Sequence, residues 1–170
     1  MGDFFPERFP KRLDEASNIP DIFQIVKDAV MLKEGWSRSG LMLGLAELGG
    51  SQDRFIGGLH PLGTNIILLN KVPLRRVQGS YPHLYKPYVL HVLMHEYLHT
   101  IGIIGEEGTR ARVLAITEPL FGEEHLATKF AKDISQFLPF VTYSITTSLP
   151  EGTQIELVEG FDRSSANHIS

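Results

Sequence analysis

The chain has 170 residues, of which 42% are hydrophobic, and it carries a formal net charge of -4 with no cysteine. This length and apolar content suit a single globular domain, which we expect to span residues 1–160 and to precede a polar tail at 161–170. The acidic balance predicts no nucleic-acid partner, and the lack of cysteine excludes disulfides. No run approaches the roughly 18 apolar residues of a membrane span, so we expect a cytoplasmic protein with no membrane partner.

Periodicity and turn residues outline the first half of the chain. Apolar residues recur at helical spacing over residues 20–33, which predicts an amphipathic helix. Short apolar runs bounded by glycine or proline predict strands at 41–48 and 65–70, with 55–59 as a further candidate. Residues 75–87 are rich in Gly, Pro, Ser and Tyr, which predicts a loop.

The most informative motif follows this loop. His95, Glu96 and His99 spell H-E-x-x-H inside an apolar stretch at 87–101 that predicts a buried helix. Residues four apart lie on the same face of a helix, so the two histidines can hold one metal ion with Glu96 beside it. Gly102 can supply the left-handed residue that ends the helix.

The second half of the chain predicts further helices and a hairpin. A helical segment is expected from near Glu106, and an amphipathic helix at 123–137. β-Branched residues at 141–148 and 154–158, on either side of a Pro-Glu-Gly turn, predict a β-hairpin. For the polar tail, the alternatives are a disordered end, a final strand that pairs with a neighbouring chain, or a side chain (Asp162 or His168) that enters the cleft expected at the H-E-x-x-H motif.

The motif predicts a zinc site of the catalytic type. Such a site has three protein ligands and an open position for water, and without cysteine the ligands must be histidines and carboxylates. His95 and His99 supply two of them. Glu96 comes directly after the first ligand, so it would lie near the water without binding the ion, which suits a general base.

The third metal ligand is less defined. Glu106 is the first candidate, because a chain that turns at Gly102 can bring its next residues back to the metal. Glu107 would point elsewhere if Glu106 faces the metal. Glu118 is the alternative if the chain first forms a helix.

Several further residues are candidates for supporting roles. His91 precedes His95 by four residues, but three rings along one straight helix spread over about 12 Å, too far for one ion, so we place it beside the site. Arg110 can pair with Glu106 on the helix surface or orient its carboxylate. His60 could line the cleft of the site, but we expect a histidine in such a loop to be exposed. Four tyrosines could donate a hydrogen bond to an oxyanion: Tyr81, Tyr85, Tyr88 and Tyr143.

The motif His95-Glu-Tyr-Leu-His99 resembles that of the zincin superfamily of metallopeptidases. The run from His95 through Gly102 to Glu106 is similar to small, compact zincin-like proteins, in which an acidic ligand follows a few residues after the glycine. The strand at 65–70 looks like the edge strand that pairs with an extended peptide substrate in zincins. Gly105 departs from the metzincin pattern, and no N-E-x-x-S-D run surrounds Glu118 as in the thermolysin-like group.

The resemblance implies an α+β, zincin-like fold, in which a small twisted mixed sheet packs on an N-terminal helix and on the motif helix, with a helical C-terminal part. It also implies a zinc metallopeptidase that binds a peptide or protein substrate as an extended strand. In that reading His95, His99 and Glu106 bind zinc and Glu96 is the general base. The alternative is a metal-binding zincin-fold sensor or interaction protein whose peptidase activity is absent or latent.

Overall fold

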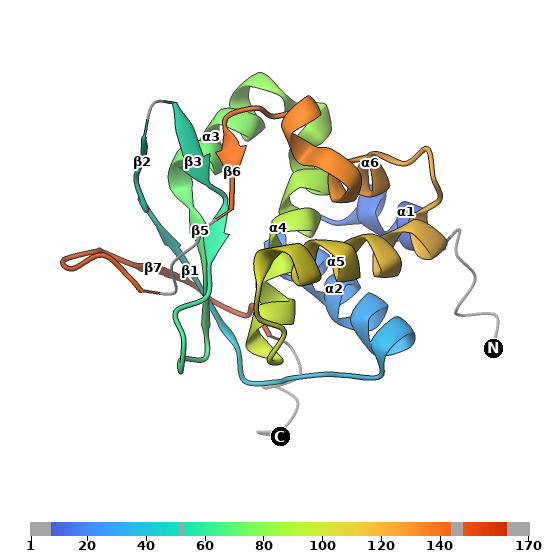
Figure 1. The fold of residues 1–170 in the computed structure, drawn as a ribbon, viewed down its shortest axis with the longest axis horizontal. Coiled ribbons are helices and arrows are strands. Elements are labelled where there is room, and N and C mark those ends of the chain that lie inside the picture. Colours follow the sequence, from blue (N-terminus) through green and yellow to red (C-terminus); the bar gives the residue numbers. More distant parts are fainter. Residues whose placement is uncertain (1–7, 52, 144–147, 163–170) are drawn as a thin grey trace.

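Helices and short strands form an α+β fold in the computed structural model, which describes residues 8–51, 53–143 and 148–162 (Figure 1). The α-helices are α1 (Arg8–Glu15), α2 (Ile19–Glu34), α3 (Lys71–Ser80), α4 (Tyr85–Thr100), α5 (Glu106–Phe121) and α6 (Leu126–Asp133), with 3-10 turns η2 (Pro82–Leu84) and η3 (Ile134–Gln136). The strands are β1 (Met42–Ala46), β2 (Gly50–Ser51), β3 (Arg54–Ile56), β4 (Gly58–Leu59), β5 (Ile66–Asn70), β6 (Val141–Thr142) and β7 (Glu156–Val158). Within the described ranges, no helix combines the length and the apolar character needed to cross a bilayer.

The strands form two small sheets. A mixed sheet has the order β4-β5-β1-β7, in which β1 and β5 are parallel and the two outer strands are antiparallel to their neighbours. The second sheet has the order β2-β3-β6. The strands predicted at 41–48 and 65–70 are confirmed as β1 and β5, but the expectation of an edge strand at 65–70 is wrong, because β4 pairs along the outer side of β5.

The candidate strand at 55–59 is divided at Gly57 between the two sheets. The Gly57 N–H donates to the Thr142 carbonyl oxygen at 3.3 Å, and the Gly57 carbonyl accepts from the Asn70 N–H at 2.9 Å. The chain therefore passes from β3 to β4 at this glycine, and β4 begins with a second glycine, Gly58. These consecutive glycines bring the backbone close to α4, since a Cβ at Gly57 would lie 3.0 Å from the Val92 side chain.

The prediction of a loop at 75–87 is wrong. Helix α3 covers residues 75–80, η2 follows at Pro82–Leu84, and α4 begins at Tyr85. The Asn70 side chain accepts a hydrogen bond from the Val72 N–H at 3.2 Å and caps the start of α3. Pro73 lies in the first turn, where its missing N–H costs no helical hydrogen bond, so a proline typical of loops is compatible with this helix.

The predicted C-terminal hairpin is also wrong. β6 pairs in parallel with β3 and β7 pairs antiparallel with β1, so the two strands belong to different sheets. The start of the predicted polar tail is buried: the Phe161 ring stacks on Phe23 with centroids 4.0 Å apart. Asp162 forms a 2.7 Å ion pair with Lys27 instead of entering the cleft, and His168 lies outside the described residues.

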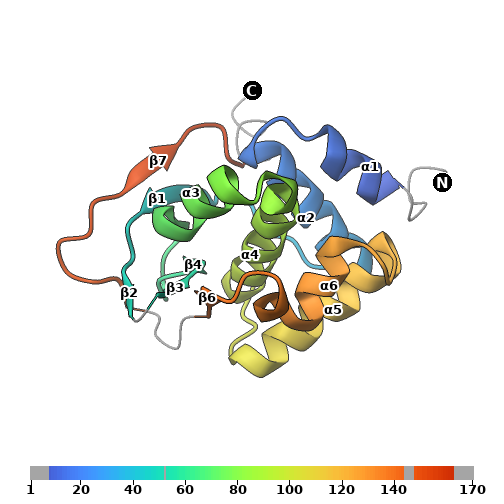
Figure 2. The same ribbon diagram turned by 90° about the horizontal axis from the view of Figure 1, so that it is seen from above.

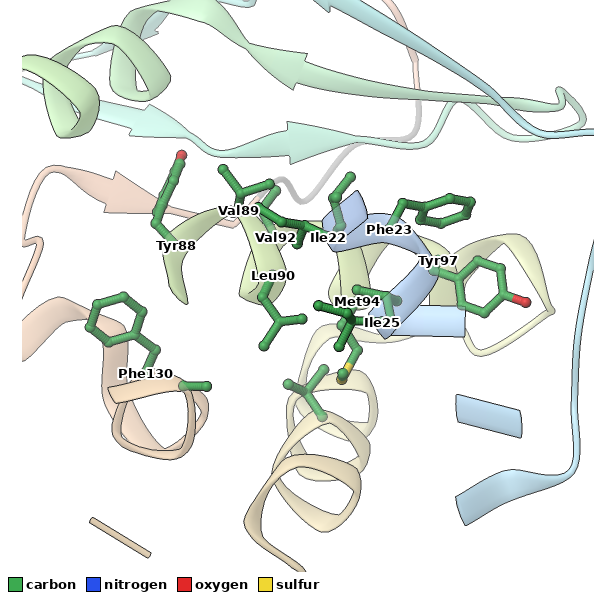
Figure 3. Close-up of a cluster of buried hydrophobic side chains, with 14 of the residues drawn as sticks. Ile22, Phe23, Ile25, Tyr88, Val89, Leu90, Val92, Met94, Tyr97 and Phe130 are labelled. Carbon is green, nitrogen blue, oxygen red and sulfur yellow. The ribbon is translucent and has the colours of Figure 1, made fainter. Parts of the chain in front are cut away.

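Helix α4 lies between the sheets and helices α2, α5 and α6 (Figures 1 and 2). It contacts β4 and β5 on one side, and α2, α5 and α6 pack against it on the other sides (Figures 1 and 2). Val89 points toward the strands while Leu90 and Met94 point away from them, and all three side chains are buried (Figure 3). The buried motif helix is thus confirmed, and α2 confirms the helix at 20–33. The helix predicted at 123–137 is shorter than expected, because α6 ends at Asp133 and η3 follows.

Candidate metal centre

The turn between α4 and α5 places an acidic residue beside the two motif histidines. Gly102 has a φ of 101° and lies just after the end of α4, where the Ile103 N–H donates back to the Leu98 carbonyl at 3.1 Å. Gly105, with a φ of 92°, then turns the chain into α5, which begins at Glu106. Glycine tolerates both positive φ values without steric penalty, so the chain reverses within a few residues and brings Glu106 to the end of α4.

The three candidate ligands converge on one point. Glu106 Oε2 lies 2.9 Å from His95 Nε2, and Glu106 Oε1 lies 3.3 Å from His99 Nε2. One ligand atom from each residue lies within 4.8 Å of the others. The two imidazole rings meet edge to face, with centroids 4.8 Å apart and 82° between their planes. Two nitrogens and a carboxylate therefore surround a space that one cation can occupy.

The bonding of these atoms fits a metal ion. Glu106 Oε2 is buried and has no hydrogen-bond partner among the described residues, although it lies close to His95. The His99 Nδ1–H donates to the Ile103 carbonyl oxygen at 2.7 Å, so in the neutral ring Nε2 presents a lone pair to the cluster. His95 Nδ1 is buried and lacks such a support within the described part of the chain. Two imidazole nitrogens and one carboxylate are a typical ligand set of catalytic zinc.

The charges within the cluster are strongly coupled in the metal-free protein. Burial by itself would raise the pKa of Glu106, but His95 and His99 outweigh burial and lower this pKa to about 2. Burial lowers the pKa of His95 despite the neighbouring Glu106. For His99, burial opposes the charged form, but Glu106 and Glu96 raise the pKa. An anionic Glu106 beside two imidazoles favours a cation between them.

Glu96 lies beside the cluster and is buried, with 6% of its surface exposed. Burial raises its pKa to about 8, while His99 and a hydrogen bond from the backbone of His60 act in the opposite direction. A carboxyl group with a pKa near neutrality can both accept and release a proton under physiological conditions. His60 itself is buried, contrary to the expected exposed position, because its Nδ1–H donates to the Ile66 carbonyl oxygen at 2.9 Å.

The alternative ligands do not join the cluster. Glu107 is exposed, as expected if its neighbour faces the metal. Glu118 pairs with Lys132 at 3.7 Å. Arg110 does not pair with Glu106; its guanidinium carbon lies 5.1 Å from the centroid of the Tyr143 ring.

Of the four candidate tyrosines, Tyr143 lies at the site. Its ring stacks on the His95 ring with centroids 4.6 Å apart, and its hydroxyl oxygen lies 2.7 Å from His91 Nε2. His91 is therefore beside the site, as expected, and is not part of the ligand cluster. A hollow adjoins Glu96 and is lined by Gly57, Gly58, His91, Val92, His95, Glu96, Val141, Thr142 and Tyr143. The glycine pair and the strand before Tyr143 were not expected near the motif, because no spacing in the sequence links them to it.

The chain matches no protein-family model, and comparisons with curated proteins and with solved structures give no significant match. Its function must therefore be inferred from the chemistry of the site.

Proposed function

We propose that the protein is a zinc-dependent metallopeptidase of zincin-like fold. The proposal depends on one observation: His95, His99 and Glu106 present three ligand atoms to a common point, and Glu96 is buried beside them. The three ligands leave room for water or substrate at the ion, which is typical of catalytic zinc and not of structural zinc. The resemblance of the motif to zincins supports the same reaction class.

The metal site and Glu96 have separate roles in the proposed hydrolysis. When bound, zinc supplies Lewis acidity, which makes water nucleophilic near neutral pH. Glu96 takes a proton from the attacking water onto its carboxylate and passes it to the nitrogen of the leaving amine. The close approach of Gly58 limits the movement of the Glu96 side chain during both transfers.

The substrate is an extended peptide that adds to β4. This strand is one of the two outer strands of the mixed sheet, and it lies directly against α4 and Glu96. A peptide that pairs with β4 would bring its backbone past the base, whereas β5 is already paired on both sides. Strand addition recognises the peptide backbone and accepts varied side chains.

The test is cleavage of denatured casein by the zinc-loaded protein, with and without a chelator. We expect chelator-sensitive cleavage, and a loss of about 10²- to 10⁴-fold in Glu96→Gln with one zinc retained per chain. Glu107→Gln is the matched control, because Glu107 is an exposed glutamate next to the cluster. Stoichiometric zinc without chelator-sensitive cleavage would favour the metal sensor, and absence of stoichiometric zinc would refute both proposals.

A further inference from the structure

Tyr143 is a polar side chain at the site that is neither a candidate metal ligand nor the proposed base. Its ring stacks on His95, with 26° between the ring planes, and it lines the same hollow as Glu96 and Gly58. It therefore borders the space where an extended peptide on β4 would pass the base. Its hydroxyl can donate a hydrogen bond into that space only if the hydroxyl hydrogen is not already bonded to another acceptor.

His91 determines whether the hydroxyl hydrogen of Tyr143 is free to point into the hollow. The His91 side chain is buried, its Nε2 lies 2.7 Å from the Tyr143 hydroxyl oxygen, and its Nδ1 has no partner among the described residues. Burial lowers the pKa of His91 to about 3, so the ring is neutral and carries one hydrogen. A hydrogen on Nδ1 would be a buried donor without an acceptor, which is rarer in proteins than an unpartnered acceptor. The hydrogen therefore belongs on Nε2, which donates it to Tyr143.

The Tyr143 hydroxyl then accepts from His91 and keeps its own hydrogen for another acceptor. Arg110 lies over the Tyr143 ring, with its guanidinium carbon 5.1 Å from the ring centroid, and adds positive charge beside this side chain. Donors that occupy the lone pairs of a hydroxyl polarise its O–H bond and strengthen it as a donor. The O–H of Tyr143 is thus left for a group in the hollow.

We propose that Tyr143 donates a hydrogen bond to the oxyanion formed from the scissile carbonyl, and that His91 is a positioning residue for its hydroxyl. This inference rests on the proposed peptidase function. As the water oxygen bonds to the carbonyl carbon, the π electron pair moves onto the carbonyl oxygen, and Tyr143 stabilises that charge. The C–N bond then breaks, and the nitrogen takes the proton that Glu96 removed from water.

The main test is Tyr143→Phe, which removes the hydroxyl and retains the ring that packs on His95. We expect kcat on casein peptides to fall about 10²- to 10³-fold, with zinc stoichiometry unchanged. Affinity for a phosphinic peptide, whose tetrahedral anionic group imitates the oxyanion, should fall by a similar factor. Substrate affinity, measured in the Glu96→Gln background to prevent cleavage, should change less than about threefold. Tyr85→Phe is the control, since Tyr85 lines a different hollow.

The role of His91 is tested by a double-mutant cycle. H91F should weaken binding of the phosphinic peptide in the wild-type background and should have little further effect in the Y143F background. H91Q, which keeps an N–H donor, should restore part of the affinity. If the wild type cleaves casein normally and zinc-loaded Y143F retains both kcat and phosphinic affinity, the role of Tyr143 is refuted while the peptidase proposal stands. If the wild type does not cleave, both proposals fail.

Discussion

Gly58 faces Glu96 across the interface between β4 and α4, with no room for a side chain between them. A Cβ atom at position 58 would lie 3.2 Å from Glu96 Cγ and 2.8 Å from the Leu68 carbonyl oxygen. The strand can therefore approach the proposed base this closely only with glycine at this position.

Gly58→Ala should destabilise the protein and impair the site. The added methyl group must displace either the backbone of β5 or the Val92 and Glu96 side chains, at a cost of about 1–3 kcal/mol. Urea unfolding measures the loss, and casein cleavage should fall as well because Glu96 moves. Gly79→Ala in α3 is the control: its Cβ would have no atom within 4 Å, and alanine favours a helix, so its stability should be equal or slightly higher. A Gly58→Ala protein as stable as the control would contradict the contact.

Glu106→Gln should lose zinc. The amide that replaces the carboxylate is neutral and binds a divalent cation poorly, so we expect zinc affinity to fall at least about 100-fold in chelator competition. Glu107→Gln removes the same charge one residue later, outside the cluster, and should bind zinc like the wild type. Equal zinc affinities for the two variants would exclude Glu106 as a ligand, and Glu118 would then be the candidate for the third ligand.

The metal-free protein should become less stable as the pH rises, because of Glu96. Its pKa of about 8 lies above the ordinary 4.5, so the folded state holds a proton that the unfolded state releases. The stabilisation of the folded state by this proton is fully present below about pH 4.5 and is lost as the pH rises to about 8. Its size is about 1.4 kcal/mol for each pKa unit between the folded and unfolded states.

Glu96→Gln isolates this effect, since glutamine resembles the protonated acid at every pH. In chelator, urea unfolding should give similar stabilities for the two proteins at pH 5 and a variant more stable by several kcal/mol at pH 8. His99 and Glu106 face the same site and contribute to the pH dependence of both proteins, so the informative quantity is the difference between them. A difference that does not change with pH would show that Glu96 is not buried as described.

Asp162→Ala should destabilise the protein more than the loss of a surface charge. Asp162 pairs with Lys27 at 2.7 Å and also accepts from the Leu41 N–H at 3.1 Å, and both charged side chains are buried. Removal of one partner from a buried pair costs about 3–5 kcal/mol. Glu156→Ala removes half of a largely exposed pair with Lys71 and should cost at most about 1 kcal/mol. Thermal unfolding of the two variants compares these costs directly.

Local signals in the sequence predicted local structure. The H-E-x-x-H spacing and its apolar surroundings predicted α4, and the glycine after His99 predicted the turn that brings Glu106 back. Pairing over long distances carries no such signal. The hairpin expected at the C-terminus followed from adjacency, but β7 finds its partner in β1 and β6 finds its partner in β3.

Composition was misleading where side chains make specific contacts. The residues of α3 looked like a loop until the cap from Asn70 is considered, and the tail looked polar although Phe161 packs on Phe23. Tyr143 could not be chosen among the tyrosines, because only the fold brings its strand to His95.

All three candidate ligands come from one continuous stretch, residues 95–106. Such a short segment loses little loop-closure entropy when its ends meet, so the ligand cage needs no distant part of the chain to close it. By contrast, the residues that lie against Glu96 and His95, namely Gly58 and Tyr143, reach α4 from remote segments. Metal binding therefore does not require the remote segments to pack correctly around the site. A chain that misfolds its sheets could still bind metal.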